Sequence, residues 1–365
     1  MMLFCTIVLL AYVMAIALLL VGFFRMKEFE VDETQPKTKF TIVVPFRNEA
    51  KNLPKLLESF SKLNYPNELF EVILIDDDSN DGFGVGNYDY QIQVLKNERS
   101  SNSPKKDAIK TAIASARFDW IVTTDADCNV PENWLKAFDC CIQKKQPEMI
   151  AGAVKYNPEN SFLNAFQQLE LASLQATTIG AFGLGKPFMC NGANFAYTKS
   201  LFEKLNGFDG NEDSASGDDV FLLQKAVSAF PEKVGYLKSD EAIVATKAAE
   251  NWKSLFYQRV RWAAKAGSYS SWFGKVLGLI VFFGNISWIL GLLIVSFSFF
   301  SLQILVLLVA KLIVDFMLIF SANEFLKSKT RYFILGSLLY PIFSTCVAVY
   351  SVFGTFEWKG RTFRK

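Results

Sequence analysis

Residues 118–130 read FDWIVTTDADCNV, an apolar run that leads directly into two aspartates separated by one alanine. A second apolar run, FEVILIDDDSND at 70–81, also ends in acidic residues. Around these runs, β-rich segments alternate with helical ones, which is the order that builds a sheet flanked by helices. The sequence therefore predicts an α/β domain, with strands at 39–46, 70–81, 91–96 and 119–127 and helices at 49–63 and 104–116.

The acidic residues fall where such a domain binds ligands. In open α/β sheets the ligand crevice lies beyond the carboxyl ends of the strands, and Asp76, Asp77, Asp125 and Asp127 occupy such ends. At a strand-to-loop transition a D-x-D sequence can present both carboxylates to one hard cation. Because Mg²⁺ and Mn²⁺ prefer oxygen ligands and keep substrate phosphates in their shell, and the chain has no histidine, we expect a metal–diphosphate site. Solvated turn residues are the alternative for an isolated D-x-D.

The composition indicates a hybrid of membrane and water-exposed parts. Of the 365 residues, 51% are hydrophobic and 20% are charged. Residues 3–24 form an uncharged run long enough to span a bilayer, and a signal peptide is disfavoured because the charged n-region is missing. Three more apolar runs follow at about 276–299, 301–320 and 331–354. Lys311 and Asp315 in the second of these are four residues apart, so we expect them to pair.

Basic residues predict the orientation in the membrane. Arg25 and Lys27 follow the first run, and three further cations precede the last one, namely Lys327, Lys329 and Arg331. The positive-inside rule then places the central region in the cytoplasm, at the inner cell membrane. A fourth full crossing would export the basic tail WKGRTFRK. A re-entrant or surface-lying last segment, interrupted at Pro341, would remove that conflict.

Cysteine spacing and net charge exclude other classes. The six cysteines show no C-x-x-C spacing, which argues against a disulfide framework and a zinc site. A net charge of +2 argues against a nucleic-acid partner.

The ordered set of motifs resembles the GT-A domain of membrane-bound family 2 glycosyltransferases, a Rossmann-like fold that transfers a sugar from a nucleotide diphosphate with inversion. The resemblance covers about 36–265. It is carried by VVPFRNEA (43–50), VILIDDDSND (72–81), SPKKDAIKTAI (103–113), TTDADC (123–128), CNGANFAYTKSLFEKLNGF (190–208), SGDDVFLL (216–223) and QRVRW (258–262).

The resemblance implies roles on the donor side. Nucleotide-sugar contacts fall on Pro45, Arg47, Glu49, Asp77, Lys105 and Asp125. Asp78 stands where glycine is commoner in the family, and Ser103–Pro104 replaces a glycine before Lys105. The metal, Mg²⁺ or Mn²⁺, falls on Asp127 and Asp125.

On the acceptor side, the resemblance implies that Asp219 is the catalytic base and that Asp218 is the neighbour most easily confused with it. A carboxylate must take the proton of the acceptor hydroxyl in a direct displacement. A helix N-terminal cap at S-G-D-D is the structural alternative and can coexist with that role. The acceptor and diphosphate contacts implied by the family are Asn191, Gly192, Gln258, Arg261 and Trp262.

The segment around QRVRW has the pattern of an interfacial helix. An apolar stripe runs through Trp252, Leu255, Phe256, Val260 and Ala263. Gln258, Arg261 and Trp262 share the adjoining face, which we expect to turn toward the crevice. A basic helix that merely anchors the domain is the alternative.

These observations predict five segments: an N-terminal anchor (1–25), a GT-A domain (36–240), an interfacial helix region (241–275), a transmembrane region (276–354) and a basic tail (355–365). The expected activity is inverting, metal-dependent transfer from a nucleotide sugar, UDP-linked, to a membrane-embedded lipid acceptor. The expected partners are the donor, a lipid or glycan acceptor and the bilayer. A processive polysaccharide synthase and a non-catalytic membrane scaffold with a degenerate nucleotide-binding fold are the alternatives.

Overall fold

The computed structural model describes residues 1–211, 217–265, 269–297, 301–354, 356–358 and 361–363. The chain forms two compact units. We call them the helical unit, made of residues Met1–Met26, Pro158–Pro187 and Ala248–Lys365, and the sheet unit, made of residues Lys27–Asn157 and Phe188–Lys247.

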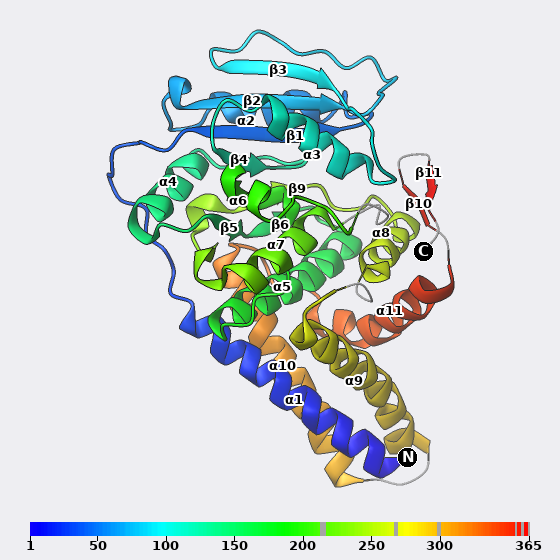
Figure 1. Cartoon of the computed structure of the whole chain (residues 1–365). Coiled ribbons are helices and arrows are strands. Elements are labelled where there is room, and N and C mark those ends of the chain that lie inside the picture. The colour runs from blue at the N-terminus through cyan, green and yellow to red at the C-terminus, as the bar shows by residue number, and fades with distance from the viewer. Residues whose placement is uncertain (212–216, 266–268, 298–300, 355, 359–360, 364–365) are drawn as a thin grey trace. The chain divides into compact units, whose positions relative to one another are not determined.

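The sheet unit is built on a seven-stranded sheet (Figure 1). Its spatial order is β3 (Gln91–Lys96), β2 (Phe70–Asp76), β1 (Phe40–Phe46), β4 (Trp120–Thr123), β7 (Phe195–Thr198), β5 (Met149–Gly152) and β8 (Val234–Leu237). Strand β7 is antiparallel to both of its neighbours, while the other pairs are parallel. A second, two-stranded sheet pairs β6 (Val154–Tyr156) with β9 (Val244–Thr246).

Helices complete the sheet unit and bury its strands. They are α2 (Leu53–Ser61), α3 (Pro104–Ser115), α4 (Trp134–Lys145), α6 (Lys199–Lys204), α7 (Asp218–Ala229) and the short 3₁₀ turns Asn67–Leu69, Gly192–Asn194, Pro231–Lys233 and Asp240–Ala242. Strands β1 and β2 are buried almost throughout, as continuous apolar strands in a covered parallel sheet should be. On one face the core includes Phe60, which stacks on Trp134 with ring centroids 6.3 Å apart.

The predicted strands are confirmed in place, but two are shorter than expected. The strand predicted at 119–127 ends at Thr123, and the one predicted at 70–81 ends at Asp76. After β4, the Thr124 amide still donates to the Val43 carbonyl at 3.2 Å, and the chain then turns, with the Cys128 amide donating to the Asp125 carbonyl at 3.0 Å. The D-x-D aspartates therefore lie in a turn beyond the strand.

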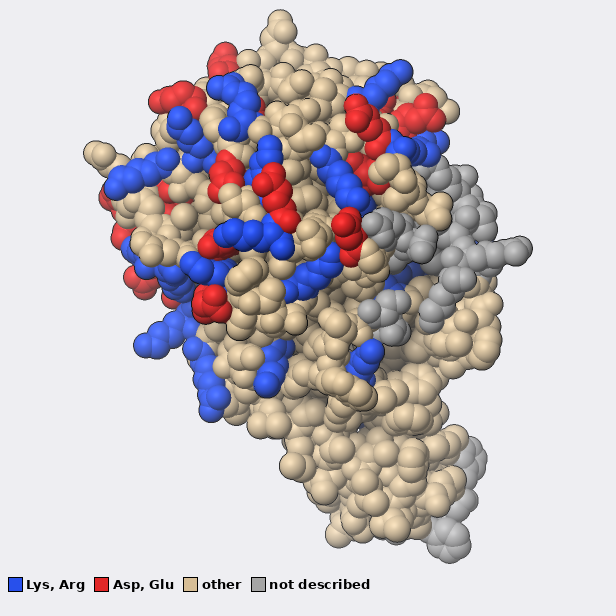
Figure 2. Space-filling view, in the orientation of Figure 1, with Lys and Arg blue, Asp and Glu red and all other residues tan. Residues whose placement is uncertain are grey.

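The helical unit contains α1 (Met2–Arg25), α5 (Phe162–Gly183), α8 (Trp252–Ala264), α9 (Trp272–Phe297), α10 (Leu302–Phe325), α11 (Phe333–Phe353) and the hairpin of β10 (Phe356–Trp358) and β11 (Arg361–Phe363). Helix α1 packs on α5, α9 and α10, whereas α11 packs mainly on α8 and α9. In Figure 1, α11 runs across α9. By length and composition, α1, α9, α10 and α11 could each cross a membrane. On the face shown in Figure 2, the charged side chains gather over the sheet unit, and the helices that could cross a membrane are almost free of them.

Two contacts fix α1 inside the helical unit. Glycines let its backbone touch that of α5, because a Cβ built on Gly180 would lie 2.4 Å from the Leu19 carbonyl oxygen. The expected pair of Lys311 and Asp315 is confirmed, with Nζ 2.7 Å from Oδ2. The Tyr12 hydroxyl of α1 donates to the same carboxylate of α10 at 2.8 Å.

Candidate active site

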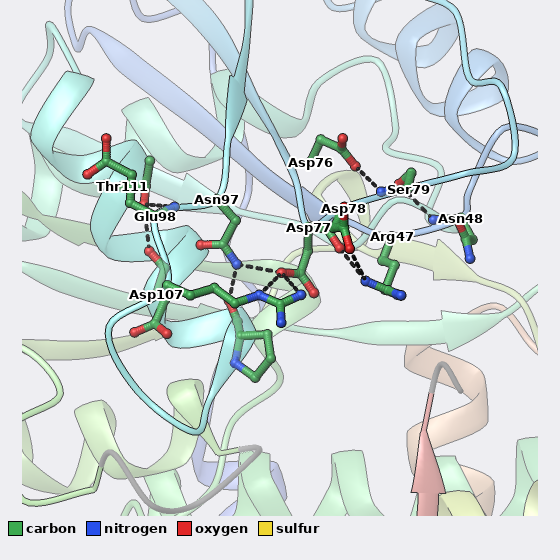
Figure 3. A network of polar contacts seen from close by, with 12 residues as sticks. Arg47, Asn48, Asp76, Asp77, Asp78, Ser79, Asn97, Glu98, Asp107 and Thr111 are labelled. Atoms are coloured by element: carbon green, nitrogen blue, oxygen red, sulfur yellow. Dashed lines mark hydrogen bonds and ion pairs between the residues drawn. The ribbon is translucent and has the colours of Figure 1, made fainter. Parts of the chain in front are cut away.

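The loop after β2 is held by polar side chains from neighbouring loops (Figure 3). The Asp77 carboxylate accepts from Asn97 Nδ2 and from Arg99 Nε, each at 2.8 Å. Its backbone amide donates to the Phe46 carbonyl at the end of β1, at 2.9 Å. The ends of the adjacent strands β1, β2 and β3 thus converge on Asp77, one of the residues expected to contact the nucleotide sugar.

Three residues at or near the end of β1 are predicted to contact the nucleotide sugar, and they lie in different environments. The Arg47 guanidinium donates to the Asp77 carbonyl at 2.7 Å, so it joins the loops after β1 and β2. Pro45 lies within β1, in register with Ile75. Glu49 accepts from the Asn52 side chain at 2.6 Å, at the start of α2.

The unusual residue of this loop has a backbone explanation. Asp78 has φ +66°, in the left-handed region that glycine adopts freely and that aspartate tolerates better than most residues. This backbone at residue 78 would suit the glycine that the resemblance leads us to expect there. Its carboxylate lies 3.7 Å from Arg47 and is 88% exposed.

Lys105 joins the D-x-D turn to the predicted catalytic segment. Its ammonium lies 2.8 Å from an Asp125 oxygen and 3.5 Å from an Asp218 oxygen. Burial lowers the pKa of Lys105, but Asp125, Asp218 and Asp219 outweigh burial and raise it above its usual value. The side chain is therefore a fixed cation. It projects from the first turn of α3, where Pro104 occupies a position that suits its fixed φ.

The two aspartates at the start of α7 have different surroundings. Asp218 is buried and faces Lys105, while Asp219 is half-buried and accepts from the Gly192 amide at 2.8 Å and from the Val220 amide at 2.8 Å. Gly217 precedes them with φ +91°. Their place in the first turn also suits the helix dipole, so the structural and chemical roles coexist. Ser216 of the expected cap lies outside the described residues.

Residue 192 sits against this acidic pair. A Cβ built on Gly192 would lie 3.3 Å from an Asp218 oxygen and 3.4 Å from the Asp219 Cβ. The Gly192 carbonyl accepts from Thr123 of β4 at 2.7 Å, and Asn191 accepts from the Ala193 amide at 3.0 Å. The predicted acceptor loop and the predicted base are therefore brought together.

Asn194 holds that loop from within the core. It is fully buried, accepts from Trp134 Nε1 at 2.9 Å and donates to the Ala153 and Ala242 carbonyls at 2.8 and 2.7 Å. Motif spacing alone did not identify this role, nor those of Asn97 and Arg99. Both of the latter follow β3, so the rule that ligands bind beyond strand ends would have pointed to them.

The D-x-D pair has the donor chemistry of a divalent-cation site. Asp125 and Asp127 offer carboxylate oxygens, the ligands that Mg²⁺ and Mn²⁺ prefer, and Asp127 also lies 3.4 Å from the Thr246 hydroxyl. Among the described residues no group of three or more cysteines, aspartates and glutamates could hold a metal. A pair of carboxylates fits a cation that takes its other oxygens from a substrate diphosphate.

The remaining predicted residues, Gln258, Arg261 and Trp262, lie in α8 of the helical unit, and their approach to the crevice stays a prediction. A residue that the motif did not single out organises this helix. Arg259 is buried, lies 2.9 Å from Glu170 of α5 and 4.2 Å from the centre of the Trp262 ring, and donates to the Gln258 side chain.

Comparisons with known proteins agree with this arrangement. Residues 41–206 match the model of glycosyl transferase family 2. The chain is 27% identical over 240 residues to the probable glycosyltransferase YdaM of Bacillus subtilis, covering 62% of this chain and 54% of that protein. It is 27% identical over 272 residues to the beta-monoglucosyldiacylglycerol synthase of Nostoc, covering 70% of this chain and 54% of that protein.

A solved structure shares the fold. The mannosyltransferase PcManGT from Pyrobaculum calidifontis, in complex with GDP-Man and Mn²⁺, superposes with a TM-score of 0.56 at 16% identity, covering 93% of this chain and 99% of that chain. The chain spans about half the length of the curated relatives named above. From the family match and the relatives, we conclude that residues 41–206 form a segment of the glycosyl transferase family 2 type, and the shared sheet shows the GT-A fold.

Proposed function

We propose that the protein is an inverting, metal-dependent glycosyltransferase that moves one sugar from a nucleotide sugar, UDP-linked, to a lipid acceptor at the cytoplasmic face of the inner membrane. One observation carries the proposal. Lys105 joins the D-x-D turn to the start of α7, where Asp219 contacts the Gly192 loop. The residues to which we assign donor binding, acceptor binding and proton transfer are thus contiguous within the sheet unit, and this supports the proposal.

The chemistry follows from the residues at this junction. Asp219 is half-buried beside the acceptor loop, and we assign it to take the proton of the attacking hydroxyl. Asp77, with Arg99, orients the nucleotide. Asp125 and Asp127 would hold Mg²⁺ or Mn²⁺, which when bound neutralises charge on the departing diphosphate. Lys105, which contacts Asp125, would add a second positive charge for that diphosphate.

A membrane lipid is the acceptor class that we favour. Four helices of the described chain are long and apolar enough to span a bilayer, and relatives such as that of Nostoc are named beta-monoglucosyldiacylglycerol synthase. A hydroxyl presented at the membrane surface would suit an enzyme that carries its catalytic domain and such helices in one chain.

The test is to incubate the detergent-solubilised protein and Mn²⁺ with labelled nucleotide sugars, in parallel reactions with host lipid extract. We expect one donor to yield a labelled lipid that carries a single sugar. A labelled polymer would instead identify a processive synthase. If no donor is transferred or hydrolysed, the protein is a non-catalytic scaffold.

A further inference from the structure

An apolar groove lies in the helical unit where α11 begins beside α10. Its volume is about 650 Å³, and its walls are formed by residues 332–335 and by Val309, Leu312, Ile313 and Phe316 of α10. The four α10 positions follow the spacing of a single helix face. The volume is within the range of about 300–1,000 Å³ that is typical of ligand sites.

The lining of this groove suits a hydrocarbon chain. Ile313 is 53% exposed and Ile334 is 65% exposed, and both belong to helices apolar enough to lie in a membrane. Lipid tails are as apolar as these side chains, so packing alone would hold a chain only weakly. Selection of one kind of lipid therefore needs a polar contact at the end of the groove.

A cationic turn supplies that contact. Lys327, Lys329 and Arg331 are all exposed in the turn between α10 and α11, and Arg331 directly precedes Tyr332 in the groove wall. Residues 324–331 contain one acid, Glu324 on the last turn of α10, against these three cations. The segment therefore carries an excess of positive charge. Cations next to a membrane helix attract anionic lipid headgroups.

The turn is held in place by hydrogen bonds. The Thr330 hydroxyl accepts from Asn323 Nδ2 at 3.1 Å, and Arg331 donates to Asn160 Oδ1 at 3.0 Å. Within the described part of the chain, neither Lys329 nor Arg331 has an acidic partner. The turn that carries both cations is therefore held directly before the groove residue Tyr332.

Tyr332 marks the boundary between the two parts of the site. Its ring meets that of Phe162 edge-on at 5.6 Å, and the side chain is 56% exposed. Tyrosine is enriched where hydrocarbon meets headgroups. Its φ of +55° is uncommon for a bulky residue, and this backbone turns the chain from the cationic segment into the groove wall.

We propose that this groove binds one hydrocarbon chain of an anionic phospholipid, whose phosphate is held by Lys329 and Arg331. The proposal is independent of the glycosyl transfer, because it concerns lipid retention in the absence of donor.

The experiment is native mass spectrometry of the full-length protein in detergent with equal amounts of phosphatidylglycerol and phosphatidylcholine of identical chains. We expect preferential retention of phosphatidylglycerol. The double variant Lys329→Gln/Arg331→Gln should weaken that retention about 10- to 30-fold. The matched control is Lys253→Gln/Lys275→Gln, which removes two exposed cations elsewhere in the same unit and should change retention little.

A second pair of variants tests the groove itself. Val309→Trp fills it, whereas Val306→Trp adds the same bulk to an exposed position of α10 outside its walls. We expect only Val309→Trp to lower retention of phosphatidylglycerol. The proposal would be overturned if Lys329→Gln/Arg331→Gln and Lys253→Gln/Lys275→Gln lost equal amounts of bound phosphatidylglycerol. Unchanged retention in Val309→Trp would overturn it as well.

Discussion

Asp218 and Asp219 are adjacent in sequence but lie in different surroundings. The first is buried against the fixed cation of Lys105, and the second is half-buried against the acceptor loop. Asp218 is thus tied to Lys105, whereas Asp219 contacts the loop that is expected to meet the acceptor. On this placement we assign the base to Asp219 and a positioning role to Asp218.

Replacing each aspartate should separate these roles. Asp219→Asn should lower kcat by about 10²–10⁴ with little change in UDP affinity, because a base contributes mainly in the transition state. Asp218→Asn should instead lower thermal stability, since it leaves Lys105 with one fewer partner. Rate, UDP affinity and melting temperature are measured on both variants. Near-normal turnover of a folded Asp219→Asn protein would end the base assignment.

The D-x-D pair can be tested in the same assay. Asp127→Asn should abolish the Mn²⁺-dependent part of UDP binding while leaving the melting temperature close to that of the wild type, because a neutral amide is a much weaker ligand for a hard cation. Isothermal titration calorimetry with and without Mn²⁺ checks this. Asp78→Asn is the matched control, since Asp78 is a nearly fully exposed acid after another strand. Unchanged Mn²⁺-dependent affinity in Asp127→Asn would contradict the ligand role.

Much of the site at this scale could be predicted, because strand ends gather ligand-binding residues. The positions of Asp77 and Asp125 beyond parallel strands follow from the pattern of apolar runs. The second contact of Lys105, with Asp218, could not be predicted, because it joins residues 113 positions apart in sequence through tertiary packing alone. The same holds for Asn194, whose partners come from three separate parts of the chain.

At the scale of elements, α8 shows where periodicity falls short. Its apolar stripe was predicted, and Leu255 and Val260 are indeed fully buried. The burial of Arg259 was not predicted, because burying an arginine charge is costly unless an acid from another element pairs with it. Glu170 of α5 provides that acid, and no local sequence pattern indicates this pairing.

The Q-x-x-R-W helix yields a prediction about charge geometry. Arg261→Lys keeps the charge but loses the planar fork that suits diphosphate oxygens, so it should lower turnover strongly at constant membrane association. The measurement is kcat in proteoliposomes together with the membrane-bound fraction. Lys253→Arg on the same helix is the control and should behave as wild type. If Arg261→Lys also does so, α8 serves only as an anchor.

The contact between α1 and α5 yields a prediction about packing. Gly180→Leu would drive a side chain into the Leu19 carbonyl, so it should destabilise the protein by about 1–3 kcal/mol or more. Gly278→Leu is the matched control, because a Cβ at that helical glycine meets nothing within 4 Å. Thermal unfolding in detergent compares the two. Equal melting temperatures would show that the close approach is not needed.

At the scale of the whole molecule, the chain passes repeatedly between its two compact units. Helix α5 lies between two segments of the sheet unit in sequence, yet it belongs to the helical unit. The hydropathy pattern predicted the apolar runs at the ends of the chain, but α5 is only moderately apolar and was not expected among them. The segment ranges predicted from sequence remain a prediction, since they divide the chain by composition.

The course of α11 predicts the location of the tail. Helix α11 packs across α9 and on α8. It is continuous from Phe333 to Phe353, so the interruption expected at Pro341 is wrong. A surface-lying segment would leave the basic tail in the cytoplasm, as the positive-inside rule requires. Green fluorescent protein fused after Lys365 should therefore fluoresce, and alkaline phosphatase at the same place should be inactive. Fusions after Phe297 should give the opposite result, and an active phosphatase on the tail would establish a fourth crossing.

The glycine contact of α1 also bears on how such a protein can be rearranged. An N-terminal apolar helix is often regarded as an interchangeable tether, for which any sequence of sufficient hydropathy will serve. Here the close backbone approach between Leu19 and Gly180 and the Tyr12 hydrogen bond to Asp315 give α1 a specific packing site. A foreign helix of equal length would insert but would not dock. Chimaeras that exchange whole anchors between relatives should therefore carry α5 and α10 along with α1.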